Sequence, residues 1–345
     1  MREGVAPVNQ ICMAVFLAAN DNDVYNRKSL MLQKVLFCPV LTWCAQTWVG
    51  CGVRRFFICC DSEMKQEALA CFPADVEILW SDSDAPLAEF AAGYQVQEIR
   101  QAVFPQGEEM TALTSAADLV AVEERCRQEQ VARLRAAGVR IMDGASTYID
   151  PRVTVAPGTE ILPGTILRGC TEIGPNCEIG PNALVENSRL GEGVKVNASQ
   201  VYDSVLERGV DVGPYAHIRP KCHVGEKCHV GAFVQLKNCN LGPETKMSHL
   251  TYVGDSDVGA RVNFGCGTVT SNYDGFKKHR TVIGDDVFVG CNTNLVPPVR
   301  VENGAYIAAG TTVTRDVPAD SMVIGRVRQE IKEGWAARWR KLHGK

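Results

Sequence analysis

The stretch Glu172–Val185, "EIGPNCEIGPNALV", decides the fold, because its pattern repeats every six residues. Isoleucine followed by glycine occurs at Ile173–Gly174 and again at Ile179–Gly180, and the next apolar residue of the series is Val185. The same spacing of apolar residues continues, with few breaks, from residue 149 to residue 313. A hexad repeat is typical of a β-helix, in which each hexad forms one short flat side and the following turn. Three hexads therefore close one triangular coil.

The position four residues after each apolar residue is small or β-branched, as at Ala183, Val234 and Thr251. We expect these residues to point inward and to stack on the next coil. The repeat has room for about nine coils, a prism of roughly 45 Å at a strand spacing of ~4.8 Å. Aliphatic side chains fill such an interior, so any ligand site must lie outside, on a ridge or between subunits. Three cysteines share the small inward position and are expected to be core thiols: Cys177, Cys222 and Cys228.

The residues before the repeat have a different rhythm. Residues 1 to 80 alternate short apolar runs with longer helical stretches, and this βαβαβ order predicts a small parallel sheet. A helix is predicted to start with Ser115 as its N-cap and to end at Gly138, a C′ position that glycine favours. We therefore expect a mainly β protein in four parts. These are a small α/β domain over 1–114, a linker helix over 115–140, a β-helix over 141–325 and a basic tail over 326–345.

Composition narrows the class of partner and the compartment. A formal net charge of -4 argues against a general nucleic-acid binder, whose electrostatic footprint should be basic. A small molecule is the expected partner. The 15 cysteines are odd in number and show neither a C-x-x-C motif nor a paired zinc spacing. Free thiols in a reducing cytoplasm are the interpretation that this pattern favours.

Two apolar runs near the start of the chain resemble targeting or membrane segments. Residues 11–19 have the length of a signal h-region, but Arg2 is offset by Glu3 and no A-x-A cleavage site follows. Residues 35–53 are long enough to span a membrane, but they contain Pro39 and Gln46. We expect no membrane association and interpret the second run as a buried helix of the α/β domain.

Three histidines at a spacing of six suggest a metal site at first sight. They are His217, His223 and His229. Six residues in this repeat move a side chain to the next face of the coil, whereas stacking would need about 18. No metal site is therefore predicted, and the three histidines are expected to be solvated.

Arg219 and Lys237 occupy the position after the apolar residue, where the repeat prefers glycine or a small residue. They are 18 residues apart, one full coil, and should stack ~4.8 Å apart along the axis. Two cations held so close repel each other unless an anion lies between them, which indicates a phosphate site. The alternative is that both are solvated surface charges.

The segment after Lys237 carries further polar side chains. His249 titrates near neutral pH and is a candidate general base, although a lone histidine can also be structural. Tyr252 and Asn263 add hydrogen-bonding groups nearby. The stretch "SNYDGFKKH", residues 271–279, interrupts the repeat with residues that do not fit the inward positions, and we predict an outward loop there.

Several longer strings resemble one family. "HLTYVGD", "NFGCGTVTSNYDG", "TVIGDDVFVG", "AYIAAGTTVTRDVP" and the terminal "EGW" are similar to the acetyltransferase half of GlmU, over about residues 115 to 335. The resemblance implies a left-handed parallel β-helix, an exception to the usual crossover handedness, assembled as a homotrimer. It also implies acetyl transfer from acetyl-CoA to glucosamine 1-phosphate by direct attack, in the synthesis of UDP-N-acetylglucosamine for the cell wall. Acetyl-CoA is then a co-substrate, and no permanently bound cofactor is expected.

The resemblance also assigns roles to individual positions. His249 matches the catalytic base of the family. Lys278 matches a loop lysine that reaches the sugar-phosphate site of a neighbouring subunit. The other matches to the sugar-phosphate site are Arg219, Lys237, Tyr252 and Asn263. The matches to acetyl-CoA contacts are Asn272, Tyr273, Ala309 and Arg326, together with Cys266 and Cys291.

Three positions depart from the family pattern. The family usually has a small residue at Cys266 and serine at Cys291, and both cysteines are small enough for the backbone contacts to survive. The family has an acidic residue where this chain has Gln235, so a carboxylate that could assist with the substrate amine is missing.

The match fails in the first domain. The full-length enzymes of the family open with L-A-A-G-x-G-T-R-M, a glycine-rich loop that holds the UTP phosphates beside a metal. Here Asn20 and Asn22 replace the glycines and Val24 replaces the arginine, so close backbone approach to phosphate is lost. We predict a truncated, degenerate domain without uridyltransferase activity, and a Mg²⁺ requirement only if this domain were active. The alternatives are a bifunctional enzyme that retains uridylyl transfer and a non-catalytic trimeric β-helix scaffold.

Overall fold

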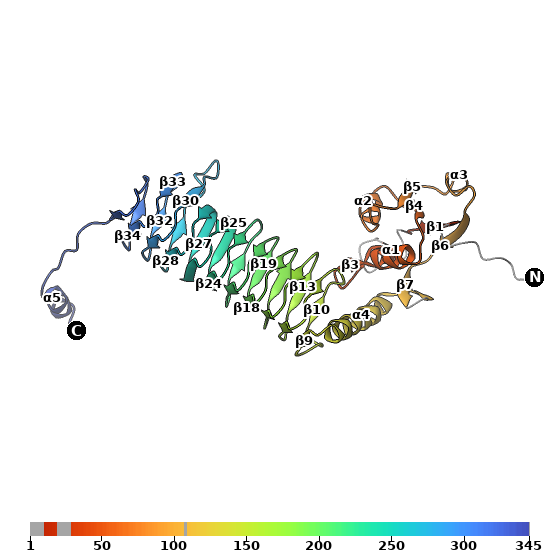
Figure 1. Cartoon of the computed structure of the whole chain (residues 1–345), viewed down its shortest axis with the longest axis horizontal. Coiled ribbons are helices and arrows are strands. Elements are labelled where there is room, and N and C mark those ends of the chain that lie inside the picture. Colours follow the sequence, from red (N-terminus) through yellow and green to blue (C-terminus); the bar gives the residue numbers. More distant parts are fainter. Residues whose placement is uncertain (1–9, 19–28, 107–108, 345) are drawn as a thin grey trace, which may run out of the picture. The chain divides into compact units, whose positions relative to one another are not determined.

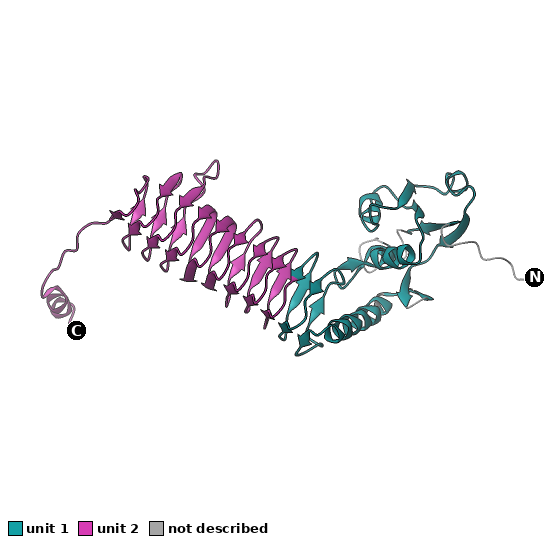
Figure 2. Cartoon of the chain, viewed as in Figure 1, with its two compact units in different colours: residues 1–172 teal, residues 173–345 magenta. Residues whose placement is uncertain are grey.

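A computed structural model describes residues 10–18, 29–106 and 109–344 of the 345-residue chain. The chain divides into two compact units, residues 1–172 and residues 173–345 (Figure 2). The degenerate phosphate-loop stretch of the sequence, with Asn20, Asn22 and Val24, lies outside the described residues. The first unit holds an α/β region, a long helix and the first turns of the repeat, and the second holds the rest of the repeat and the C-terminal tail.

The α/β region contains a four-stranded sheet in the order β5-β4-β1-β6, with all pairs parallel (Figure 1). Its strands are β1 (Ile11–Phe16), β4 (Arg55–Cys59), β5 (Glu77–Ser81) and β6 (Gln95–Ile99). The helices are η2 (Leu30–Leu32), α1 (Val40–Gly50), α2 (Lys65–Leu69) and α3 (Leu87–Phe90), and the short hairpins are β2 (Lys34–Val35) with β3 (Cys38–Pro39) and β7 (Val103–Gln106) with β8 (Glu109–Ala112). The predicted parallel sheet and the buried helix within residues 35–53 are both confirmed.

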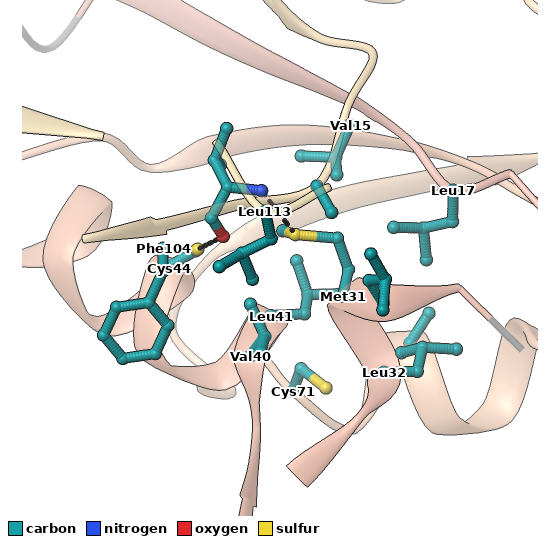
Figure 3. Close-up of a cluster of buried hydrophobic side chains, with 14 of the residues drawn as sticks. Val15, Leu17, Met31, Leu32, Val40, Leu41, Cys44, Cys71, Phe104 and Leu113 are labelled. Carbon is teal, nitrogen blue, oxygen red and sulfur yellow. Dashed lines mark hydrogen bonds between the residues drawn. The ribbon is translucent and has the colours of Figure 1, made fainter. Parts of the chain in front are cut away.

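A continuous apolar cluster packs α1 and η2 against this sheet (Figure 3). Cys44 on α1 is fully buried, and its thiol donates to the carbonyl oxygen of Val103 over 3.3 Å. The amide of Val103 in turn contacts the sulfur of Met31 at 3.3 Å. Burial raises the pKa of the Cys44 thiol, so this cysteine behaves as an apolar core residue.

The long helix α4 (Ala116–Ala136) starts and ends where the sequence predicts. The Ser115 hydroxyl accepts from the Asp118 amide, and the Asp118 carboxylate accepts from the Ser115 amide over 2.9 Å, which completes a capping box. Gly138 adopts φ +87 just beyond the helix, a conformation that favours glycine. The helix packs against the first strands of the repeat, β9 (Arg140–Ile141) and β10 (Tyr148–Ile149), which are followed by β11 (Thr154–Val155), β12 (Glu160–Ile161), β13 (Ile166–Arg168) and β14 (Glu172–Ile173).

In the second unit the strands form three faces of a parallel β-helix (Figure 1). The first face contains β15 (Glu178–Ile179), β18 (Lys195–Val196), β21 (Asp211–Val212), β24 (His229–Ala232), β26 (Lys246–His249), β28 (Asn263–Phe264), β31 (Phe288–Val289), β34 (Tyr306–Ile307) and β36 (Met322–Val323). The second contains β16 (Leu184–Glu186), β19 (Gln200–Tyr202), β22 (His217–Ile218), β29 (Val269–Thr270), β32 (Asn294–Leu295) and β35 (Thr312–Val313). The third contains β17 (Arg189–Leu190), β20 (Val205–Leu206), β23 (His223–Val224), β30 (Thr281–Ile283) and β33 (Val299–Val301). Two longer strands, β25 (Gln235–Leu241) and β27 (Tyr252–Val258), run from the second face into the third.

The inward positions are filled as the repeat predicts. The apolar residues Ile179, Val196 and Leu206 are buried, and so are the small residues that follow them in the hexads, among them Ala183, Thr245, Thr251 and Thr268. Cys177, Cys222 and Cys228 are buried as well, which confirms their inward assignment. The predicted fold class, a left-handed parallel β-helix preceded by an α/β region and a linking helix, is confirmed.

Two of the three ridges between these faces carry the residues singled out in the sequence. We call the turns between the first and second faces the first corner; they include residues 231–234, 248–251, 265–268, 290–293 and 308–311. We call the turns between the second and third faces the second corner; they include residues 219–221, 237–238, 254–255 and 271–280. Beyond the last coil the tail ends in α5 (Trp335–Leu342), which is exposed throughout. Among the described residues, none of the helices combines the length and the apolarity needed to cross a membrane.

Candidate active site

Arg219 and Lys237 stack at the second corner, one coil apart. In the pairing of β22 with β25, Ile218 lies beside Leu236, and the Arg219 amide donates to the Leu236 carbonyl oxygen over 2.9 Å. Arg219 and Lys237 are therefore in register on successive coils, which confirms the stacking that their 18-residue spacing predicts. Burial and the charge of Arg219 lower the pKa of His217, so this neighbour adds little positive charge at neutral pH.

Lys278 joins this pair from the loop after β29. The neighbouring Lys278 side chain lowers the pKa of the Lys237 ammonium group, and so do partial burial and the charge of Arg219. Lys278 therefore lies close to Lys237 within one chain. Three cations converge here, and such a cluster is suited to a dianionic phosphate.

The loop that carries Lys278 is a small hairpin that projects from the coil next to β30 (Figure 1). The Asp274 carboxylate accepts from the amides of Phe276 and Lys277 over 2.8 and 2.7 Å and contacts the His279 ring at 2.6 Å. These bonds hold the pKa of Asp274 well below its usual range. Phe276 at the tip is 96% exposed, so the predicted outward loop is confirmed.

A buried carboxylate lies close to Lys237 and Lys278. Asp255 is 6% exposed and accepts hydrogen bonds from two side-chain amides, that of Asn238 over 2.5 Å and that of Asn272. Asn272 also approaches the Tyr252 hydroxyl, at 3.4 Å. Tyr252 and Asn272 therefore belong to the same cluster as Lys237. Sequence reasoning missed Asp255 and Asn238, because aspartate and asparagine at turns of this repeat have an ordinary structural role.

Arg280 anchors the end of the loop to the third face. Its guanidinium group forms a bidentate ion pair with Asp257, with both N–O distances at 2.5 Å. It also donates to the carbonyl oxygens of Ser256 and Asn238, over 3.0 and 3.2 Å. The loop therefore leaves the coil from Asn272 and returns to a fixed point at Arg280.

The first corner carries the other half of the predicted site. His249 ends β26, is exposed, and pairs with Ala232 of the preceding coil. Its carbonyl oxygen accepts from the Thr251 hydroxyl over 2.9 Å, and its side chain is exposed. On the next coil Asn263 pairs with Lys246 on the first face, and its side chain is exposed near the same corner.

The coils beyond His249 continue this corner as a narrow ridge. The Asn292 amide donates to the Cys266 carbonyl oxygen and the Gly310 amide to that of Cys291, each over 2.8 Å. The Arg326 guanidinium group donates to the Ala309 carbonyl oxygen, also over 2.8 Å. The predicted acetyl-CoA residues Cys266, Cys291, Ala309 and Arg326 thus follow one another along one ridge.

Glycine makes this ridge possible. A Cβ atom added at Gly265 would lie 2.5 Å from the Cys291 nitrogen, and one added at Gly290 would lie 2.5 Å from the Ala309 nitrogen. Both neighbours are backbone atoms, which cannot move aside without separating the coils. The first corner is therefore built from closely approaching backbone.

The predicted site residues fall into two groups within one chain. Five residue steps separate His249 at the first corner from Gly254 at the second, at most roughly 16 Å at ~3.3 Å per residue, because the turn at Leu250 shortens the path. The second-corner group contains Arg219, Lys237, Tyr252, Asn272 and Lys278, with Tyr273 in the loop. The first-corner group contains His249, Asn263, Cys266, Cys291, Ala309 and Arg326. Gln235 lies on the second face between His217 and Tyr252.

No arrangement of three or more His, Cys, Asp or Glu side chains that could hold a metal ion occurs in residues 10–18, 29–106 and 109–344. The three histidines at a spacing of six lie on three different faces, as their spacing predicts. His223 pairs with Glu207 at 2.9 Å and His229 with Asp211 at 3.0 Å.

Comparison with known proteins gives matches of different extent. Residues 280–315 match the family model described as bacterial transferase hexapeptide (six repeats). The bifunctional protein GlmU of Clostridium perfringens is 48% identical over 231 residues, covering 67% of this chain and 51% of that protein. The bifunctional protein GlmU of Caldicellulosiruptor saccharolyticus is 43% identical over 235 residues, covering 68% and 51%.

A longer alignment extends the match at lower identity. The bifunctional protein GlmU of Clostridium botulinum is 39% identical over 292 residues, covering 80% of this chain and 64% of that protein. Among solved structures, LpxA from Acinetobacter baumannii is 19% identical and covers 58% of this chain and 77% of that one, with a TM-score of 0.27, too weak a similarity to support an inference. The chain spans about half the length of the two curated relatives from Clostridium perfringens and Caldicellulosiruptor saccharolyticus.

Proposed function

Because the chain belongs to the GlmU family through its hexapeptide-repeat half, we propose that it is a glucosamine-1-phosphate N-acetyltransferase. The reaction converts acetyl-CoA and α-D-glucosamine 1-phosphate into N-acetyl-α-D-glucosamine 1-phosphate and CoA, a step towards UDP-N-acetylglucosamine. The observation that carries the proposal is the convergence of Arg219, Lys237 and Lys278 at one corner, which suits a sugar phosphate.

The chemistry requires a base. The sugar amine is an ammonium ion at neutral pH and must lose a proton before its nitrogen can attack the thioester carbonyl carbon. In our proposal the neutral imidazole of His249 accepts that proton. The new C–N bond forms as the nitrogen loses a second proton, the C–S bond of the thioester breaks, and CoA leaves as a thiolate that takes up this second proton. Exposure of His249 at the first corner gives a substrate direct access to its ring.

The ridge that continues from His249 suits the elongated acetyl-CoA molecule. Small side chains at Cys266, Cys291 and Ala309 leave backbone groups accessible along the ridge. Arg326 at its end supplies a cation for the phosphates of CoA. The basic tail adds Lys332, Arg338, Arg340 and Lys341 to the same role.

The separation of the two groups supports a homotrimer. In this arrangement the first corner of one copy faces the second corner of the next, and a cyclic assembly closes three equivalent sites. Large apolar side chains support the contact: on successive coils at the first corner, Tyr215 is 62%, Phe233 59% and Leu250 57% exposed. Such a row on a surface is typical of an interface. Lys278 of one copy then reaches the site that holds His249 of its neighbour.

We place this reaction in the cytoplasm. Buried thiols such as Cys38, Cys44 and Cys126 are free, and burial raises the pKa values of all three. A chain with many reduced cysteines fits a reducing compartment. The uridylyl step is assigned to a separate enzyme, and Mg²⁺ is not required for acetyl transfer in this proposal.

The test follows the release of CoA thiol from acetyl-CoA in the presence of glucosamine 1-phosphate. We expect turnover by the parent and a loss of 10²-fold to 10⁴-fold in kcat for His249→Ala, the range that a general base contributes. His223→Ala is the matched control, since His223 is exposed on the third face and pairs with Glu207. A parent that releases no thiol favours the scaffold alternative, and full turnover by His249→Ala removes the proposed base. Release of pyrophosphate when the protein is incubated with UTP, Mg²⁺ and N-acetylglucosamine 1-phosphate would favour the bifunctional alternative.

A further inference from the structure

We propose that Asp255 is a positioning residue for the sugar-phosphate site, which it organises from beneath by joining three successive coils. The inference rests on the proposed function and extends it to a residue that does not itself contact the phosphate. It starts from the position of Asp255 in the backbone. Asp255 adopts φ +48, a left-handed conformation that turns the chain sharply at the second corner.

The carboxylate joins the coils on both sides of its own. One oxygen accepts from the side-chain amide of Asn238, the residue after Lys237 on the preceding coil. The other accepts from the side-chain amide of Asn272, the residue from which the Lys278 loop leaves the following coil. One carboxylate oxygen therefore bonds to the sequence neighbour of Lys237, and the other bonds to the first residue of the loop that carries Lys278. A carboxylate is the only side chain of this shape that accepts from two amide donors and donates to neither.

The charge of Asp255 is also needed where it lies. Burial alone would raise its pKa, but hydrogen bonds from Asn238 and Asn272 and the charges of Lys237 and Lys278 hold it below its ordinary value. The carboxylate therefore stays ionised beneath two ammonium groups. In return it favours the charged form of Lys237 against the repulsion of Lys278 and Arg219.

Several other charged or titratable groups lie near Lys237 and Asp255. His217 faces the cluster from β22, Arg219 from the turn after it, and Lys278 from the loop. Asp257 on β27 is already committed to Arg280 by a bidentate ion pair. Asp255 is the carboxylate that favours the charged form of Lys237. Removing this charge should therefore affect the charge state of the lysines more than the stability of the fold.

The same corner offers a matched control. Asp203 has φ +42 at the equivalent turn of an earlier coil, and its carboxylate accepts from the Asn187 side chain over 3.2 Å. It repeats the asparagine-to-aspartate pairing of the second corner away from Lys237 and Lys278. A purely structural role for such a pair should make Asp203→Asn and Asp255→Asn behave alike.

The experiment measures KM for both substrates and the binding of glucosamine 1-phosphate by calorimetry, without acetyl-CoA, from pH 6 to pH 10. We expect Asp255→Asn to raise KM and Kd for the sugar phosphate about tenfold or more, since it removes charge support from two ammonium groups. KM for acetyl-CoA should stay within about twofold of the parent value. The decline in affinity with rising pH should also begin at a lower pH than in the parent, because Lys237 would lose its proton more easily. Asp203→Asn should change none of these quantities.

A second variant covers a failure of Asp255→Asn to fold. Asn238→Gly suits the φ of +48 at that position and removes one of the two bonds while leaving the charge of Asp255 in place. It should raise Kd for the sugar phosphate by a smaller factor and leave the pH profile unchanged. The proposal is overturned if Asp255→Asn binds the sugar phosphate like the parent, or if KM for acetyl-CoA rises by the same factor. A parent that binds glucosamine 1-phosphate without turnover would contradict the proposed function, and the calorimetric comparison would still decide the role of Asp255.

Discussion

The first and second corners of the β-helix are built by different means. At the first corner the coils approach each other through backbone atoms, and glycines such as Gly290 leave no room for a side chain. At the second corner side chains form the contacts, with Asp255 bonded to Asn238 and Asn272 and the lysines above them. One repeat therefore supports two kinds of surface. The first corner is suited to lie along an extended ligand, and the second corner is suited to bind a compact anion.

The largest loss of activity is expected from variants that remove one corner's half of the site. His249→Ala removes the first-corner half of the site, and Lys237→Ala removes the second-corner half, so each variant alone should be nearly inactive. If each site combines the corners of two copies, refolding the variants together should restore up to about a quarter of the parent activity, because about one interface in four then receives both intact halves. The measurement is thiol release from the mixed sample. Separately purified variants combined without refolding serve as the control, and a failure of the refolded mixture to recover activity contradicts a shared site.

A smaller effect is expected from alanine substitutions that compare the backbone contacts of the first corner with the side-chain contacts of the second. Gly290→Ala places a Cβ atom 2.5 Å from the Ala309 nitrogen and should lower the free energy of unfolding by about 2 kcal/mol or more. Gly254→Ala meets the Tyr252 hydroxyl at 2.3 Å, the far end of a side chain that can rotate. This second variant should lose less stability and instead raise KM for glucosamine 1-phosphate, since Tyr252 and Asn272 are displaced. Thermal unfolding and steady-state kinetics of both variants test the contrast, and equal losses of stability would contradict it.

The smallest effect concerns the loop alone. Lys278→Ala should raise KM for the sugar phosphate roughly tenfold, the scale of one charge-assisted hydrogen bond, with no change in the unfolding midpoint. It should also raise the pKa of Lys237, because the neighbouring positive charge of Lys278 that lowers it is removed. Binding of the sugar phosphate would then persist to higher pH. Lys277→Ala is the matched control from the same loop, and an equal effect of both variants would reduce the role of Lys278 to general charge.

Much of this arrangement can be predicted from local sequence. The apolar residue at every sixth position predicts the β-helix, and the capping box at Ser115 and Asp118 predicts the start of α4. The spacing between Arg219 and Lys237 predicts their stacking, because the coil that joins them has the ideal length. Each of these predictions needs only one periodicity or one short motif.

The contacts of Asp255 and Arg280 depend on coils whose length departs from the ideal 18 residues. The coil from Asn238 to Asp255 is one residue shorter, so counting in steps of 18 does not bring these two side chains together. Arg280 reaches Asn238 over 42 residues of sequence because the loop lengthens its coil. The resemblance to the family groups His249 with Arg219, and only the three-dimensional arrangement shows that one chain holds them at different corners. The role of Asp255 remains a proposal that the repeat itself does not suggest.

The hairpin from Asn272 to His279 has a further consequence for how this fold can change. It leaves the coil after β29 and returns at β30, and the flanking strands keep their register with Asn294 and Val299 of the next coil. The exposed residues 273–278 contribute nothing to the filling of the prism, so their number and identity can vary while the stacked interior and the buried Asn272 stay constant. The hairpin is therefore a natural point for grafting, where loops from other hexapeptide proteins could be exchanged to select a different acceptor on the same scaffold.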